Sequence, residues 1–241
     1  LSLNRHIRMG WSVVSEELGE FVEILPPQKR VSEHWYQGTA DAVYQNLYSI
    51  AQENPQHVIV LSGDHVYKMD YAKMLRFHKD RGAAVTLAAI EIPIHEAARF
   101  GVLSVGEHDR VTGFIEKSKH APSIPGSPDL ALGSMGIYIF NTDVLLRALE
   151  ADAARPSSHD FGKDIIPALI TELSVFAYRF YDEINYAIDD QFVDYGDAFT
   201  VGGEVRGRTF VAFMVVLMGA PRLDSDLSSV ITPSEIAFDC L

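Results

Sequence analysis

Residues 58–71 read VIVLSGDHVYKMDY. The apolar run Val58–Leu61 is typical of a buried strand, and the chain continues from it through a short turn to Asp64. Ligands of open α/β sheets bind outside the carboxyl ends of strands, so a carboxylate here is well placed to hold a metal ion on a phosphate-bearing substrate. An aspartate that only closes a turn would give the same pattern. The adjacent Gly63 favours the functional interpretation, because glycine lets a ligand approach the backbone.

A helix is predicted on each side of this strand. Before it, Gly38 forms a turn and Thr39 is a good N-cap for a helix that ends at Asn54-Pro55. After it, residues 70–81 have helical spacing, and residues 84–92 form a second apolar strand. The order strand, helix, strand predicts a parallel α/β sheet.

The chain between residues 101 and 181 alternates strands with helices. The expected elements are a hairpin of residues 101–105 and 111–116, a strand at 135–140, helices at 142–151 and 161–170, and a strand at 175–181. We therefore predict an α/β fold with a mostly parallel, Rossmann-like sheet flanked by helices. After about residue 184 the pattern weakens, and the apolar run 209–220 is shorter than the roughly 20 residues that a membrane span needs.

The composition is that of a globular protein with an acidic surface. Of 241 residues, 47% are hydrophobic, and the formal net charge of −13 argues against non-specific nucleic-acid binding. The single Cys240 cannot form an intrachain disulfide, so a reducing, cytoplasmic location is expected. The opening LSLNRHIRMGW lacks a signal-peptide core and an initiator methionine, so we expect no membrane association and a chain that begins inside a longer protein.

The end of the expected strand 111–116 carries an acid beside a base, Glu116 and Lys117. Neighbouring side chains on a strand point to opposite faces, so we expect the two not to form a single solvated pair. One would accept hydrogen bonds from hydroxyls while the other binds phosphate. The alternative is an ordinary exposed strand end.

Three other segments carry candidate ligand-binding residues. Tyr36, Gly38 and Thr39 lie in a turn at a helix N-terminus, where backbone N–H groups bind a phosphate or a base edge. Ser134 precedes an apolar strand, and its hydroxyl is either a ligand contact or a turn hydrogen bond. Asp160 is expected to be a helix N-cap.

Together these segments resemble bacterial glucose-1-phosphate adenylyltransferases (ADP-glucose pyrophosphorylases). The resemblance covers about residues 1–184 and rests on motifs that follow one another in the family's order and spacing: HIRMGWSVVSEELGEFVEILPPQKR, WYQGTADAVYQNL, LSGDHVYKMDY, FGVLSV, GFIEK, SMGIYIFN and SSHDFGKDIIP. It implies adenylyl transfer from ATP to glucose 1-phosphate, giving ADP-glucose and pyrophosphate for glycogen or starch synthesis. It also implies Mg²⁺ as cofactor and a homo-oligomer at full length.

The resemblance assigns roles to individual residues. Asp64 would hold the catalytic Mg²⁺, and Lys117 would position the attacking phosphate, which makes these two the expected catalytic residues. The substrate-binding positions implied are Tyr36, Gly38, Thr39, Gly101, Glu116, Lys117 and Ser134. In the family a second aspartate also binds metal, and its nearest match here is Asp194.

The sequence departs from the family's pattern in three places. The N-terminal strand and glycine-rich GGxGxRL loop, which grips the triphosphate, have no counterpart here. The family's WRDVGT motif is reduced to VDYGD at residues 193–197, and residues 200–241 show no β-helix repeats. We therefore expect residues 1–184 to be a partial catalytic domain, truncated at both ends and inactive in this form, and residues 185–241 to be a tail of unclear structure.

Two other functions remain open from the sequence. A non-catalytic chain could bind sugar phosphate or pair with an intact subunit. A nucleotidyltransferase of the same class could use UTP or dTTP in place of ATP.

Overall fold

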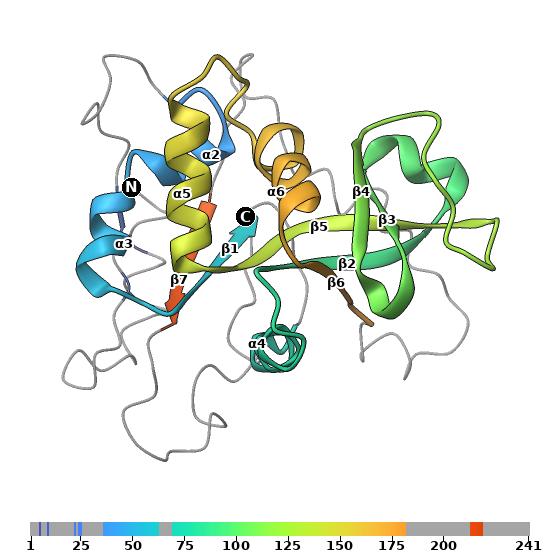
Figure 1. The fold of residues 1–241 in the computed structure, drawn as a ribbon, viewed down its shortest axis with the longest axis horizontal. Helices are drawn as coiled ribbons and strands as arrows, with labels where there is room; N and C mark the ends of the chain where they lie inside the picture. Colours follow the sequence, from blue (N-terminus) through green and yellow to red (C-terminus); the bar gives the residue numbers. More distant parts are fainter. Residues whose placement is uncertain are drawn as a thin grey trace.

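The computed structural model describes residues 36–62 and 69–181, the backbone of residues 213–218, and the isolated residues Arg5, Met9, Val22, Ile24 and Leu25. Figure 1 shows one sheet with helices packed against it. The helical elements are α2 (Thr39–Tyr44), α3 (Leu47–Glu53), α4 (Tyr71–Asp80), η2 (Ile94–Arg99), η3 (Glu107–Asp109), α5 (Thr142–Ala153), η4 (Phe161–Ile165) and α6 (Ile166–Glu172). The strands are β1 (His57–Ser62), β2 (Val85–Pro93), β3 (Gly101–Val105), β4 (Val111–Glu116), β5 (Leu130–Asn141), β6 (Val175–Arg179) and β7 (Phe213–Met218).

The long strand β5 organises the sheet. It pairs antiparallel with β1, β2 and β3, while β4 pairs antiparallel with β3 and β7 antiparallel with β1. The pairing of β2 with β6 is parallel. The α/β class and the flanking helices are confirmed, but the pairing corrects the mostly parallel arrangement that we expected. The difference arises because β5 runs between β1 and β2 in the opposite direction to both.

Both faces of the sheet are buried. Helices α2, α5 and α6 cover one face and α4 covers the other (Figure 1). Along β1, Val58 and Val60 join the core beneath α5, whereas Ile59 and Leu61 join the core beneath α4. This alternation across two cores explains why β1 is an unbroken apolar run.

Helix α4 agrees with the prediction from sequence. The Asp70 carboxylate caps it by accepting hydrogen bonds from the amides of Ala72, at 2.9 Å, and Lys73, at 3.3 Å. Beyond its last residues Gly82 adopts a left-handed conformation, with φ of 54°. A carboxylate cap of this kind typically stabilises a helix by about 1 kcal/mol.

The helix expected from Thr39 to Asn54-Pro55 is broken into α2 and α3. Gly38 is the N-cap, and Thr39 is the first helical residue rather than the cap. The break follows α2, where the side-chain amide of Asn46 donates to the carbonyl of Ala42 at 2.8 Å and to the Tyr36 hydroxyl at 3.0 Å. Asparagine side chains compete with the helix for backbone partners in this way.

The remaining elements follow the expected order with different bounds. The hairpin forms as β3 and β4, and β5 is longer than the expected strand 135–140. The helix expected at 161–170 begins as the π-helical turn η4 before continuing as α6. Strand β7 comes from the region beyond residue 184 and pairs with β1, and the domain boundary at 184 stays a prediction.

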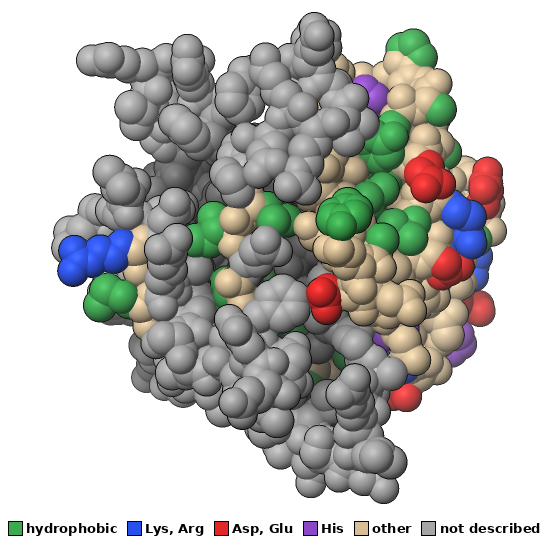
Figure 2. Space-filling view, turned by 90° about the vertical axis from the view of Figure 1, so that its left-hand side faces the viewer, with side chains coloured by type: hydrophobic (Ala, Val, Ile, Leu, Met, Phe, Trp, Pro, Cys, Tyr) green, Lys and Arg blue, Asp and Glu red, His purple; other side chains and the backbone are tan. Residues whose placement is uncertain are grey.

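The described surface carries side chains of both charges. On the face drawn in Figure 2, acidic and basic side chains of the described residues lie beside one another at one edge. In the part of the chain that the structure describes, no helix has both the length and the apolar character needed to cross a bilayer.

Candidate functional site

The turn that precedes α2 docks onto the segment that precedes η4. The amide of Ala40 donates to the carbonyl of His159 at 2.8 Å. The Thr39 hydroxyl donates to the Asp160 carboxylate at 3.2 Å and accepts from the amide of Phe161 at 3.0 Å. The contact joins residues 121 positions apart in the sequence, so two of the motifs in the resemblance meet in space.

Gly38 is required for this close approach. A Cβ atom built on Gly38 would lie 2.3 Å from the carbonyl oxygens of both Ser158 and His159. Any larger residue would therefore push the turn away from the 158–161 segment. The expected role of Gly38 in binding a ligand stays a prediction.

Asp160 connects the turn to η4. One carboxylate oxygen accepts from the amides of Gly162, at 2.9 Å, and Lys163, at 3.1 Å, which confirms the expected N-cap. The other oxygen receives the Thr39 hydroxyl. The neighbouring Phe161 ring is buried, with its centroid 5.7 Å from that of Tyr138, so the core holds this segment in place.

Glu116 lies at the end of β4 against two glycines. It pairs with Gly101 across the hairpin, and a Cβ atom at Gly101 would lie 2.8 Å from Glu116 Oε2. A Cβ atom at Gly162 would lie 3.1 Å from the same oxygen. Glycines from β3 and η4 thus leave room for the Glu116 carboxylate and bring the hairpin against the Asp160 segment.

The charges around Glu116 oppose one another. Burial raises the pKa of the Glu116 carboxyl, and the nearby Asp160 carboxylate also raises it. The cations Lys117 and Lys163 act in the opposite direction and lower that pKa. A half-buried carboxyl between a second carboxylate and two cations is the kind of arrangement that marks a binding site for a polar, charged ligand.

Lys117 does not point away from Glu116 as expected. Its Nζ lies 3.9 Å from Glu116 Oε1, and its side chain is 67% exposed. The strand alternation fails here because β4 ends at Glu116 and Lys117 adopts a left-handed backbone conformation, with φ of 44°. The exposed ammonium group is therefore free to reach an anion beside Glu116.

Ser134 lies at an irregular point of β5. The register against β2 shifts between Ser134 and Tyr138, Gly136 has φ of 68°, and the Ser134 hydroxyl accepts from the Gly136 amide at 3.3 Å. Ser134 also hydrogen-bonds the buried Tyr138, whose hydroxyl has a raised pKa because of burial. The charges of Asp160 and Glu116 raise the pKa of Tyr138 further, so these groups lie within electrostatic reach of one another.

The family model described as "Nucleotidyl transferase" matches residues 1–196. The chain belongs to the nucleotidyl transferase family. Among its curated relatives, the glucose-1-phosphate adenylyltransferase of Koribacter versatilis (strain Ellin345) is 57% identical over 186 residues, which are 76% of this chain and 45% of the relative. The enzyme of the same name from Teredinibacter turnerae (strain ATCC 39867 / T7901) is 55% identical over 183 residues, 75% of this chain and 44% of the relative.

A third relative agrees with these two. Glucose-1-phosphate adenylyltransferase 2 of Vibrio cholerae serotype O1 (strain ATCC 39315 / El Tor Inaba N16961) is 52% identical over 180 residues, 74% of this chain and 44% of the relative. This nucleotidyl transferase chain therefore spans slightly less than half the length of the curated relatives it matches.

The predicted metal ligands of this nucleotidyl transferase, Asp64 and Asp194, lie outside the described residues. Within the described ranges, no group of three or more histidine, cysteine, aspartate or glutamate side chains could hold a metal ion. The magnesium site stays a prediction.

The other predicted site residues fall in two connected places. The turn of Tyr36, Gly38 and Thr39 contacts the Asp160 segment, and the Asp160 segment contacts Glu116. Gly101 and Lys117 flank Glu116, and Ser134 lies near this region through its hydrogen bond with Tyr138.

Sequence reasoning from single residues missed the contacts of Gly162 and Tyr138, although these two residues lie inside the motifs SSHDFGKDIIP and SMGIYIFN.

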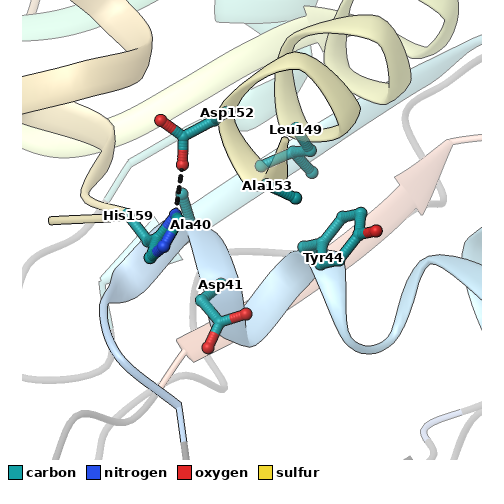
Figure 3. A pocket seen from close by; sticks show the side chains of 7 residues that line it. All are labelled: Ala40, Asp41, Tyr44, Leu149, Asp152, Ala153 and His159. Atoms are coloured by element: carbon teal, nitrogen blue, oxygen red, sulfur yellow. Dashed lines mark hydrogen bonds and ion pairs between the residues drawn. The ribbon is translucent and has the colours of Figure 1, made fainter. Parts of the chain in front are cut away.

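A small hollow lies between α2 and α5 (Figure 3). It is lined by Ala40, Asp41, Tyr44, Leu149, Asp152, Ala153 and His159. The hollow contains no space for even a sphere the size of a water molecule, so it is too small to hold a sugar phosphate or a nucleotide.

Proposed function

We propose that this chain carries the sugar-phosphate-binding part of a glucose-1-phosphate adenylyltransferase. In that reaction a phosphate oxygen of glucose 1-phosphate attacks the α-phosphorus of ATP, the bond to pyrophosphate breaks, and ADP-glucose forms. The observation that supports the proposal is the meeting of Glu116, Gly101 and Lys117 with the Asp160 segment, to which the Gly38–Thr39 turn is docked. Relatives at 52–57% identity carry the name of this enzyme.

The side chains suit a phosphorylated sugar. The exposed Lys117 ammonium provides a point charge for the phosphate. The Glu116 carboxylate, 3.9 Å away, provides an acceptor for sugar hydroxyls. Ser134 offers a further hydroxyl close to the same region, through its hydrogen bond with Tyr138.

Little covalent work is asked of the protein in this reaction, because positioning and electrostatic stabilisation account for most of the rate. Mg²⁺ belongs to the proposal, with Asp64 and Asp194 as the residues that would hold it. The ion would draw charge from the phosphates when bound. ATP as the nucleotide and glycogen or starch synthesis as the pathway belong to the proposal as well.

A cytoplasmic location and a homo-oligomer at full length complete the proposal. The location rests on the single cysteine, Cys240, which cannot form an intrachain disulfide.

The test is calorimetric titration of the 241-residue chain with glucose 1-phosphate, with glucose 6-phosphate and inorganic phosphate as comparison ligands. We expect glucose 1-phosphate to bind at least about tenfold more tightly than either, because the sugar and its anomeric phosphate would engage Glu116 and Lys117 together. Equal binding of the three compounds, or none, would sink the proposal.

A second measurement follows pyrophosphate release from ATP, UTP and dTTP in the presence of glucose 1-phosphate and Mg²⁺. Release from ATP above that from the other nucleotides supports adenylyl transfer. Preference for UTP or dTTP would assign another nucleotide. Sugar-phosphate binding without release from any nucleotide is the result we expect, because the sequence contains no GGxGxRL loop to grip the triphosphate, and it would make this chain a binding chain in its present form.

A further inference from the structure

His159 holds an unfavourable backbone conformation at the centre of the docked turn. Its φ is 53°, in the left-handed region that costs a non-glycine residue roughly 1–2 kcal/mol. Such strain persists only where surrounding contacts enforce it. The cause of the strain is therefore to be found among the contacts of His159.

The His159 ring is held by a buried carboxylate. Asp152, near the end of α5, is 3% exposed, and its Oδ2 lies 2.7 Å from His159 Nδ1 (Figure 3). A carboxylate accepts only, so the ring donates through Nδ1–H. The hydroxyl of Ser157 also lies 2.9 Å from Nδ1 and accepts from the His159 amide at 3.0 Å, which fixes the residue from two sides.

The main-chain carbonyl of His159 caps the N-terminus of α2. Its carbonyl accepts from the amides of Ala40, at 2.8 Å, and Asp41, at 3.3 Å, which are among the first amides of α2. The N-cap of α2 is Gly38, which has no side chain to do this. The orientation of the His159 carbonyl thus decides where α2 begins.

Asp160, the residue after His159, connects the same turn to the candidate site. Asp160 receives the Thr39 hydroxyl with one oxygen and caps η4 with the other. A rotation of the backbone at His159 would displace both the His159 carbonyl and the Asp160 carboxylate. It would therefore separate the turn of Gly38 and Thr39 from η4, and η4 from Glu116.

We propose that Asp152 and His159 are positioning residues: their hydrogen bond holds the left-handed backbone of His159, which aligns the Gly38–Thr39 turn and Asp160 with each other. Neither side chain contacts substrate in this scheme, because the hollow that they line is too small for one. The alignment itself is independent of the function, but its consequence for sugar-phosphate binding rests on the function proposed above.

The test uses the full 241-residue chain with four substitutions. Asp152→Ala and His159→Ala remove the hydrogen bond between the two side chains, and Asp152→Asn keeps an acceptor for the ring. His159→Gly removes the ring but adopts positive φ without penalty. The matched control is Asp143→Ala, which removes an exposed ion pair with Arg147 on the same helix α5.

The first readout is amide hydrogen exchange, which needs no ligand. Asp152→Ala and His159→Ala should speed exchange at Ala40 and Asp41 by about tenfold, while the strand amide of Asn141 changes little. His159→Gly and Asp152→Asn should show clearly smaller effects, and Asp143→Ala none.

Unchanged exchange at Ala40 and Asp41, or equal acceleration at Asn141, overturns the proposal. Equal effects of His159→Gly and His159→Ala also overturn it, because they would assign the role to the ring rather than to the backbone.

The second readout is the dissociation constant for glucose 1-phosphate. We expect it to rise about tenfold in the two alanine variants and to recover in Asp152→Asn. Locally faster exchange with an unchanged dissociation constant would refute the link to the site. If the unmodified chain does not bind glucose 1-phosphate at all, the proposed function fails, and the exchange measurement still decides the alignment.

Discussion

The two faces of the sheet each hold a histidine in a hydrogen-bonded network, but by different chemistry. On the α4 face His78 is 1% exposed and lies between the Thr86 hydroxyl, 2.8 Å from Nδ1, and the Asn141 side chain, 3.1 Å from Nε2. Burial lowers the pKa of His78 to about 4, so the ring is neutral at pH 7. On the opposite face His159 remains partly exposed and is paired with the Asp152 carboxylate.

The two networks differ in charge and in what they hold in place. The Asn141 amide donates to the carbonyl of Ala83 at 3.1 Å, which leaves its oxygen to accept from Nε2–H of His78. This network is neutral and joins α4, β2 and the end of β5 through the interior. The network of His159 instead uses the buried Asp152 carboxylate to orient loop segments, and loops are where ligand contacts are usually carried.

The largest expected effect contrasts Phe161 with Met74, which are buried on opposite faces. Phe161→Ala should lower the free energy of unfolding by about 3–5 kcal/mol and Met74→Ala by about 2–5 kcal/mol, since each leaves a cavity. Only Phe161→Ala should also weaken glucose 1-phosphate binding, because Phe161 follows Asp160. Urea denaturation and calorimetry on both variants measure this. Equal weakening of binding by Met74→Ala would show that the two faces are not separate.

The second prediction concerns pH. The folded pKa of His78, about 4, lies below its ordinary value of 6.5, so between these values the unfolded chain takes up a proton that the folded chain refuses. Stability is therefore full above pH 6.5 and falls as the pH drops toward 4, by about 3 kcal/mol at most. The measurement is urea denaturation of the unmodified chain and of His78→Gln at pH 7 and pH 4.5. A fall of the same size in both proteins would assign the loss to other groups.

The third prediction concerns Lys117. Charge-assisted contacts to a phosphate are worth about 1.5–3 kcal/mol. Lys117→Ala should therefore raise the dissociation constant for glucose 1-phosphate roughly ten- to a hundredfold. Affinity for ATP should barely change, because Lys117 is assigned to the sugar phosphate. Lys119→Ala, a nearby exposed lysine, is the control. A larger effect on ATP than on the sugar phosphate would overturn the assignment of Lys117.

The smallest expected effect on stability contrasts Gly38, where side-chain space is lacking, with Gly82, where the backbone has positive φ. Gly38→Ala meets backbone carbonyls at 2.3 Å and should cost about 1–3 kcal/mol of stability. Gly82 has φ of 54°, and a Cβ atom there would meet nothing within 4 Å, so Gly82→Ala should cost only about 1 kcal/mol of backbone strain. Glucose 1-phosphate binding should weaken in Gly38→Ala alone. Weakening in both variants would indicate that binding only follows stability.

Much of the fold was predictable where signals are local. Helix α4 has its capping aspartate and terminal glycine within a few residues of its ends, and the hairpin of β3 and β4 pairs neighbouring segments. The antiparallel insertion of β5 was not predictable, because an apolar run does not reveal its partner or its direction. The break near Asn46 was missed because helical spacing continues through it while the side chain competes for backbone partners.

The candidate site was predictable as a set of residues but not as a geometry. The motifs indicated Glu116 and Lys117, whereas strand alternation alone misjudged their relative directions because Lys117 has positive φ. Asp160 was correctly predicted as a cap. Its second partner, Thr39, is 121 positions away in the chain, a separation that no local pattern reveals.

The central position of β5 has a consequence for folding of the nascent chain during synthesis. Strands β1 and β2 are completed before β5 in synthesis, and in the described part of the sheet all of their pairing partners come later in the chain: β5 and β7 for β1, and β5 and β6 for β2. Until residue 141 leaves the ribosome, the apolar segments of β1 and β2 therefore have exposed edges on which other chains can pair. A nascent chain whose emerged part ends before residue 130 should be a strong client for chaperones, and one whose emerged part includes residue 141 a weaker one, with one edge of β1 and one of β2 still awaiting β7 and β6.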